Sequence, residues 1–154
     1  MVTSVAAGVL ATVPMTGVME TGFRLLPADE RYPLPPRQVT EAVDAGLGGP
    51  LPEAEGVRIA STLVAHLAYG GAAGSVFALA GPGDRIGGLA RGIAFGLGVW
   101  AVSYLGLLPA LGLLSPPTRH PRGRTALMVA AHVVWGASLA LITRALERTQ
   151  QRSR

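Results

Sequence analysis

The chain alternates between four long apolar runs and three connections rich in proline, glycine and polar residues. The runs cover residues 2–23, 59–80, 88–114 and 125–143. Each run has about the 20 residues that an α-helix needs to cross a bilayer. Each is also apolar around most of its circumference, unlike a helix on the surface of a soluble protein. The pattern predicts an all-α membrane protein of one domain with four transmembrane helices.

The first connection, residues 27–57, is rich in proline and acidic residues. Residues 36–45 within it predict a short helix, with proline in its first turn and Gly46 at its end. Few of its positions are apolar, which is typical of a helix at the membrane interface. The first apolar run has the length of a signal peptide. A signal peptide carries basic residues before its apolar stretch, whereas the first basic residue of this chain, Arg24, follows the run. We therefore expect a retained span.

Residues 58–70 and 124–136 read almost as copies of each other, at a constant offset of 66 positions. The offset aligns Arg58 with Arg124 and His66 with His132. The sequence Leu-Leu-Pro-Ala also occurs twice, at 25–28 and at 107–110. We interpret the chain as two duplicated helical hairpins of the same topology. Chance similarity between helices rich in alanine and glycine is the alternative.

Polar residues inside the apolar runs are the candidate site. With this topology, the second and fourth helices enter the membrane from the same face, at Arg58 and Arg124. His66 and His132 each follow that arginine by eight residues, so both lie about 12 Å below this face. Glu20 and Tyr104, with Ser103 beside Tyr104, fall in the same half of the bundle. We predict that these side chains converge, because ionisable groups are expensive to bury in a membrane and usually serve a function there.

Each candidate also has a purely structural interpretation. Glu20 has the spacing to pair with Arg24 one helical turn away, and a neutral histidine can simply hydrogen-bond to a neighbouring helix. Tyr69 and Trp135 are expected to fill space, and His120, in the third connection, is expected to be solvated. Two histidines are too few for a tetrahedral zinc site unless a donor such as Glu20 joins them. No metal is therefore expected.

Glycines recur every fourth residue on two of the runs. Such small-residue faces let helices approach closely, either within the bundle or between protomers of a homo-oligomer. The candidate packing positions are Gly70, Gly74, Gly88, Gly92 and Gly96.

Composition narrows the class of function. All 13 basic residues are arginine, but they are scattered at the ends of the runs, with no basic stripe or RNA-binding motif, so no nucleic-acid partner is expected. The absence of cysteine excludes a thiolate nucleophile and disulfides. No HExxH motif, Walker loop, dinucleotide fingerprint or nucleophile elbow occurs. We therefore expect a protein that is not an enzyme.

Three short motifs resemble the YagU-like family of small bacterial inner-membrane proteins. They are Tyr-Pro-Leu-Pro-Pro-Arg at 32–37, Leu-Pro-Ala-Leu-Gly-Leu-Leu-Ser-Pro-Pro at 108–117, and Ala-His-Val-Val-Trp at 131–135. The resemblance covers most of the chain, although the first connection and the tail are shorter here than expected of that family. It implies a multi-pass protein of the bacterial inner membrane. It provides no catalytic residues, because the family has no assigned activity.

The leading hypothesis is a small integral membrane protein that translocates protons or a small solute, or senses pH, through His66, His132 and Glu20. One alternative is a haem-binding protein with His66 and His132 as the two axial ligands. Another is an accessory subunit of a larger membrane complex. The lipid bilayer is the expected partner in every case.

Overall fold

The computed structural model describes residues 2–47, 54–80 and 85–152, and every regular element in these ranges is helical. The long helices are α1 (Val2–Leu25), α3 (Glu55–Phe77), α4 (Arg85–Ala101) and α6 (Arg122–Arg152). The shorter elements are α2 (Pro35–Gly46), a π-helical segment (Val102–Leu107), α5 (Leu108–Ala110) and three single 3₁₀ turns, Ala28–Glu30, Ala78–Ala80 and Pro117–Arg119. The all-α prediction is therefore confirmed for the described residues.

The helix boundaries differ from the predicted runs mainly at the third and fourth. The third run was expected to reach residue 114, but its helix ends at Ala110. The cause is Gly112, which adopts a φ of 69°, a left-handed conformation that ends helices. The amides of Leu113 and Leu114 then turn back onto the carbonyl of Leu108. The fourth helix continues to Arg152, because the residues after 143 are mostly good helix formers.

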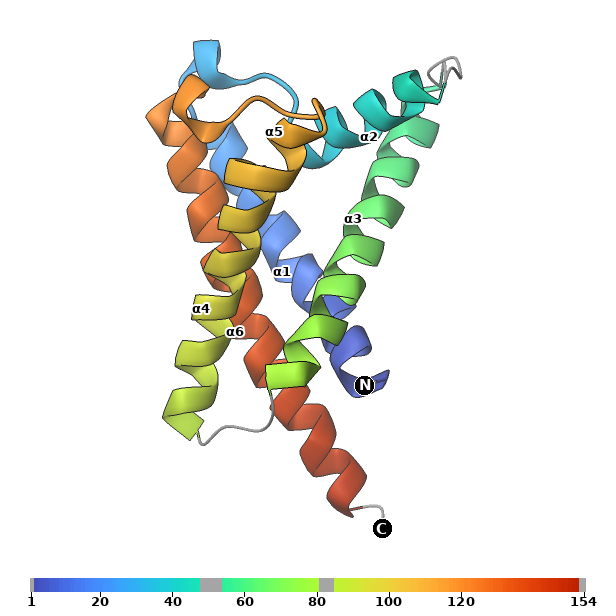
Figure 1. The fold of residues 1–154 in the computed structure, drawn as a ribbon, viewed down its shortest axis with the longest axis vertical. Coiled ribbons are helices and arrows are strands. Elements are labelled where there is room, and N and C mark those ends of the chain that lie inside the picture. The colour runs from blue at the N-terminus through green and yellow to red at the C-terminus, as the bar shows by residue number, and fades with distance from the viewer. Residues whose placement is uncertain (1, 48–53, 81–84, 153–154) are drawn as a thin grey trace.

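The predicted short helix in the first connection is confirmed as α2, with Pro35 and Pro36 in its first turn and Leu47 just past its end. Proline fits the first turn because the N–H groups of that turn have no acceptor within the helix, so the missing N–H costs no hydrogen bond. Figure 1 shows α2 lying across one end of the bundle, while both chain termini lie toward the other end. We call the first the connection face and the second the terminal face.

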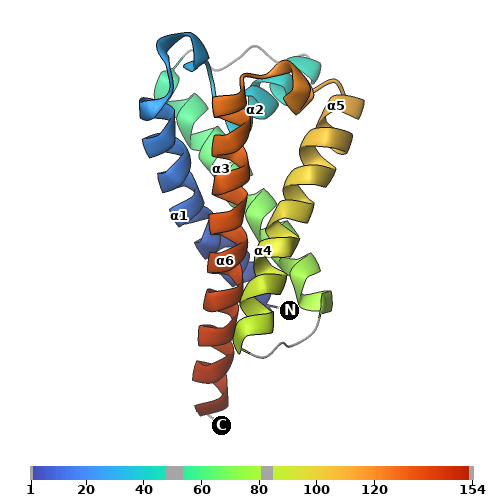
Figure 2. The ribbon, with the colours of Figure 1, turned by 90° about the vertical axis from the view of Figure 1, so that its left-hand side faces the viewer.

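The four long helices pack in the order α3, α1, α6, α4 (Figures 1 and 2). The pairs α1–α3 and α4–α6 are the two expected hairpins, and α1 and α6 also pack extensively against each other. By contrast, α3 and α4 make few contacts. The bundle is thus closed on one side and open on the other, which departs from two-fold symmetry between the hairpins. The duplication stays a prediction.

Both hairpins cross where glycines meet. In α1–α3, a Cβ added to Gly70 would overlap Thr12 Oγ1, and one added to Gly74 would overlap the carbonyl of Ser4. In α4–α6, a Cβ on Gly92 would overlap the carbonyl of Gly136. Gly96 has the same relation to the carbonyl of His132, whereas Gly88 is a half-buried residue of α4. Close helix approach in this protein therefore occurs inside the protomer.

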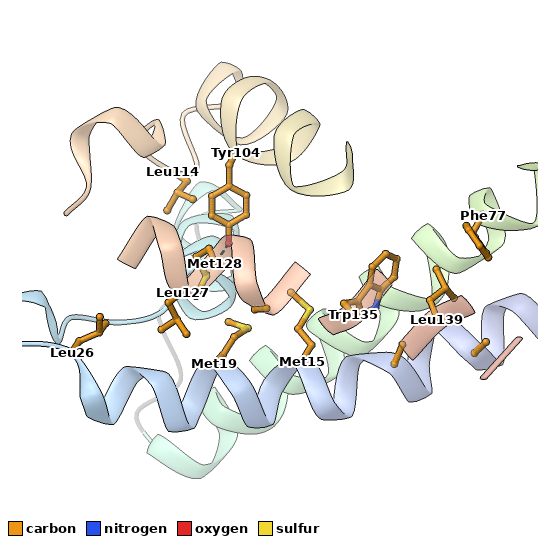
Figure 3. Close-up of a cluster of buried hydrophobic side chains, with 13 residues drawn as sticks. Met15, Met19, Leu26, Phe77, Tyr104, Leu114, Leu127, Met128, Trp135 and Leu139 are labelled. Carbon is orange, nitrogen blue, oxygen red and sulfur yellow. Dashed lines mark hydrogen bonds between the residues drawn. The ribbon is translucent and has the colours of Figure 1, made fainter. Parts of the chain in front are cut away.

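The core follows the α1–α6 contact. Ala7 and Ala11 of α1 are fully buried near the terminal face, and Met15 and Met19 follow at the same spacing toward the connection face. The larger side chains occupy the region where the helices diverge. Figure 3 shows the two methionines facing residues of α6, among them Leu127 and Met128.

Two helical segments of the described chain, Gly87–Ala110 and Arg122–Arg152, are long and apolar enough to cross a membrane. Their most apolar windows have mean hydropathies of 1.7 and 1.9. Only 17% and 33% of these windows are buried inside the protein, so most of this apolar surface faces outward. The core helix of a soluble protein would be mostly buried instead.

Candidate functional site

A cavity of about 220 Å³ lies where α3 and α4 diverge. Residues of α1 and α6 form its back wall, and residues of α2, among them Pro35 and Val39, close it toward the connection face. The cavity therefore occupies the half of the bundle in which the sequence placed the candidate polar residues.

Both predicted histidines line this cavity, His66 from α3 and His132 from α6. His132 is only 5% exposed, and its Nδ1 lies 2.8 Å from the carbonyl oxygen of Met128. A carbonyl can only accept, so Nδ1 carries the proton, and Nε2 of the neutral ring is left as an acceptor. His66 and His132 thus place two imidazole rings against one mostly apolar cavity.

Tyr104, the third predicted site residue, lines the same cavity from the π-helical segment. Its ring meets the ring of His132 edge-on, with centroids 5.8 Å apart. Its hydroxyl donates to Met128 Sδ over 3.6 Å, a weak contact drawn as a dashed line in Figure 3. Tyr104 thus packs directly against one of the two histidines.

The π-helical segment has a local cause in Pro109. Proline lacks an N–H, and its ring crowds the carbonyl four residues earlier, so the preceding turn widens. The widened turn brings Ser103 into the cavity next to Tyr104. The Ser103 hydroxyl lies 2.6 Å from the hydroxyl of Tyr69 on α3 and joins it in a hydrogen bond. Tyr69 therefore does more than fill space, because it links α3 to the π-helical segment that continues α4.

Glu20 does not join this group. It is exposed on α1 and does not line the cavity, because its neighbour Met19 faces the core and places Glu20 on the outer side of the helix. The predicted convergence therefore holds for His66, His132 and Tyr104 but is wrong for Glu20. No group of three metal-binding side chains occurs among the described residues.

Arg124 is a buried residue whose role the sequence analysis missed. It is 4% exposed, and its guanidinium donates to the carbonyls of Glu30, Tyr32 and Pro33 at 3.0, 2.7 and 2.9 Å. The guanidinium also lies 3.5 Å from the centre of the Tyr32 ring. Arg124 therefore fastens the first connection to the start of α6. Its sequence equivalent, Arg58, instead pairs with the exposed carboxylate of Glu55.

His120, which the sequence predicted to be solvated, is half-buried and contributes to the same attachment of the first connection. The hydroxyl of Tyr32 lies 2.7 Å from His120 Nδ1, and His120 Nε2 lies 3.0 Å from the carbonyl oxygen of Ser115. The carbonyl requires a proton on Nε2, so Nδ1 of the neutral ring accepts from the tyrosine. The Tyr-Pro motif at 32–33 was the available signal, but its partners lie almost 90 residues away in the sequence.

An ion-pair cluster holds α2 to the start of α3. Arg37 pairs with Glu41 at 2.8 Å and with Glu55 at 2.6 Å, and Arg58 pairs with Glu55 at 2.7 Å. Hydrogen bonds from Arg37 and then Arg58 lower the pKa of Glu55 below its ordinary value of 4.5. The stabilising effect of Glu55 is therefore present above pH 4.5 and is lost as the pH falls through the lower pKa of the folded protein.

We expect acidification below this pKa to loosen α2. Because the chain has no cysteine, Val43→Cys and Ile59→Cys give unique spin-label positions on the exposed surfaces of α2 and α3. The distance distribution between the labels should broaden at low pH. In the Glu55→Gln variant it should already be broad at neutral pH. A distribution that is narrow at both pH values in both proteins would show that the cluster does not hold α2.

Toward the terminal face the cavity is bounded by a layer of aromatic rings. The Phe77 and Phe95 rings lie 5.2 Å apart, and the Phe95 and Trp135 rings lie 6.0 Å apart. Trp135 Nε1 also donates to the carbonyl oxygen of Gly8 over 3.3 Å, which fixes the indole against α1. The glycine crossings lie in the same half of the bundle. The polar groups of the cavity therefore face an apolar layer on this side.

Comparisons with protein-family models, with curated proteins and with solved structures found no match for this chain. The function is therefore argued from the geometry of the cavity itself.

Proposed function

We propose that this chain is a multi-pass membrane protein with four spans, α1, α3, α4 and α6, that binds a small molecule in the cavity between α3 and α4. Two of these helices have the length and hydropathy of membrane spans. The other two, α1 and α3, are 24 and 23 residues long, or about 35 Å at 1.5 Å per residue, and pack beside them. They also expose large apolar side chains, among them Leu10, Val13, Ile59 and Val64.

The observation that carries the binding function is that His66 and His132, from helices far apart in the sequence, line one cavity together with hydroxyl groups. A mostly apolar cavity with a few converging polar groups is typical of a ligand site. A proton path would need polar groups that continue to the terminal face. The aromatic layer of Phe77, Phe95 and Trp135 lies there instead. The geometry therefore favours binding over proton conduction.

The same histidines supply a pH response. Protonating either ring would place a positive charge in the cavity, whose lining is mostly apolar. A neutral ligand should therefore be held best when both rings are neutral. This deepens the pH-sensing hypothesis and assigns it to the pair His66 and His132, without Glu20.

The protein is proposed to bind without catalysing a reaction. In the described part of the chain, the Ser103 hydroxyl bonds to Tyr69 and not to a histidine base that could activate it. A bacterial inner-membrane location rests on the resemblance to the YagU-like family. A homo-oligomer or an accessory subunit would need an interface other than the glycine crossings, because Gly70, Gly74, Gly92 and Gly96 already pack inside the protomer.

Haem ligation is the second candidate, because His132 Nε2 is free to bind iron and His66 lines the same cavity. The cavity of about 220 Å³ lies below the range of about 300–1,000 Å³ usual for drug-sized ligands, and haem is at least that large. The helices would have to separate to admit it. A Soret band in protein expressed with a haem supply, and its loss in His66→Ala and His132→Ala, would establish haem and overturn the small-molecule proposal.

The proposal is tested by quenching the fluorescence of Trp135, which lines the cavity, with trichloroethanol as a small neutral solute. The chain has two tryptophans, so Trp100→Phe leaves Trp135 as the only tryptophan. In nanodiscs, quenching should saturate. It should be lost in Ala65→Phe, which fills the cavity, and kept in Ala68→Phe, since Ala68 is equally exposed on α3 but does not line the cavity. Linear quenching that is identical in all three proteins would contradict a binding site.

A further inference from the structure

We propose that the cavity binds the head of an isoprenoid quinone, a neutral planar ring with an apolar tail, while the tail extends between α3 and α4 into the lipid. This inference rests on the proposed binding function and names its ligand class. It combines four features of the cavity: its charge, its size and aromatic walls, its hydrogen-bonding groups and its lateral opening.

The cavity favours an uncharged ligand. None of the described residues that line it is an aspartate, glutamate or arginine, and its only titratable groups of intermediate pKa are His66 and His132. The clusters of charge in this half of the protein, around Arg37 and around Arg124, are instead paired with carboxylates or backbone carbonyls. A phosphate or carboxylate head would therefore enter the cavity without a permanent counter-charge, at a large cost in desolvation.

The size and walls of the cavity suit a single ring. An engineered cavity of about 150 Å³ is known to hold benzene, so about 220 Å³ accommodates one substituted ring. The side chains of Tyr69, Tyr104 and Trp135 supply aromatic surfaces on three helical segments around it. Planar rings pack favourably against such surfaces in offset or edge-to-face arrangements.

The polar groups match both oxidation states of a quinone. The hydroxyls of Tyr69 and Ser103 share one hydrogen bond, so one hydroxyl proton of the pair is left to donate to a ring carbonyl. His132 Nε2 is left as an acceptor by the bond from Nδ1 to Met128, and it can receive a hydrogen bond from a hydroquinone hydroxyl. The cavity thus offers a donor on one wall and an acceptor on another.

The tail has a route into the bilayer. The ribbons of α3 and α4 diverge toward the connection face (Figure 1), the two helices make few contacts, and the cavity has lining residues on both. Cavity-lining residues on both edges of this opening are exposed, Ala65 and Tyr69 on α3 and Leu107 on the π-helical segment. In the proposed four-span arrangement these edges face lipid, which is where isoprenoid chains reside.

The test titrates decylubiquinone into nanodiscs that carry the Trp100→Phe protein and follows quenching of Trp135. We expect saturable quenching that is abolished by Ala65→Phe and kept in Ala68→Phe. Ser103→Ala combined with Tyr69→Phe should weaken the apparent affinity about tenfold, because together they remove the hydroxyl proton that donates to a ring carbonyl. The matched control is Ser75→Ala, an exposed α3 hydroxyl bonded to its own helix, which should leave the affinity unchanged.

Failure of this inference is distinguishable from failure of the proposed function. If trichloroethanol quenches saturably and Ala65→Phe abolishes that quenching, while decylubiquinone quenches equally in every variant, the cavity binds small molecules and the quinone assignment is overturned. If 1-decanol competes with trichloroethanol as well as decylubiquinone does, the ring is not recognised and the assignment is again overturned. If neither probe saturates, both proposals fail.

Discussion

Replacing Arg124 with alanine is expected to lower the free energy of unfolding by about 3 kcal/mol, the largest effect of any substitution that we predict. The guanidinium donates to three backbone carbonyls of the first connection and lies over the Tyr32 ring. Removing it leaves these carbonyls without their donor in a part-buried position. Unfolding in mixed micelles with increasing dodecyl sulfate, followed by tryptophan fluorescence, measures the change.

Arg122→Ala is the matched control, because Arg122 is an exposed arginine only two positions earlier on α6. It should leave stability almost unchanged. Arg124→Lys should recover only part of the loss, since an ammonium keeps the charge but not the planar fork that spans three acceptors. Equal effects of Arg122→Ala and Arg124→Ala would show that the carbonyl contacts do not stabilise the fold.

The second large effect is expected at the α4–α6 crossing. Gly96→Ala should destabilise the protein by about 1–3 kcal/mol, because its new Cβ would collide with the carbonyl of His132 and crowd the backbone of Gly136. Backbone atoms cannot rotate away as a side chain would, so the two helices must separate. The same detergent titration measures this change.

Gly98→Ala provides the comparison on the same helix. No atom lies within 4 Å of a Cβ placed there, so this substitution should be neutral or slightly stabilising. If the changes in the free energy of unfolding have opposite signs for these two glycines, which lie half a turn apart, then close packing rather than helix propensity sets the stability of this crossing. Destabilisation by both would show that the helix itself is the sensitive element.

Run length and hydropathy were enough to predict the long helices, and topology was enough to place His66 and His132 in the same half of the bundle. The histidines line one cavity because each lies at nearly the same distance from the start of a helix that begins at the same face. This inference needs only the rise per residue. Run length alone was insufficient at residues 111–114, where Gly112 ends the helix despite apolar neighbours.

Other features of the fold cannot be predicted from the pattern of apolar and polar residues along the chain. Nothing in the sequence distinguishes the α1–α6 contact, which is closed, from α3–α4, which is open. The position of Glu20 depends on which face of α1 is buried. Met19, its neighbour in the sequence, is buried, whereas Glu20 is exposed. The burial of Arg124 depends on backbone carbonyls, which every residue has and which therefore leave no signature in the sequence.

The contact between α1 and α6 also has a consequence for how the protein is made. Of the described helices, α1 is synthesised first, yet it contacts the last of them: Trp135 of α6 donates to Gly8 of α1, 127 positions away in the chain. Chains emerge from the ribosome N-terminus first, so of its two main packing partners α1 meets α3 well before α6 has been translated. A chain stalled before Arg122 would leave Met15 and Met19 without their partners on α6. Completion of α6 is therefore the step at which this bundle becomes stable, and chains that lack α6 should be preferred substrates for quality-control proteases.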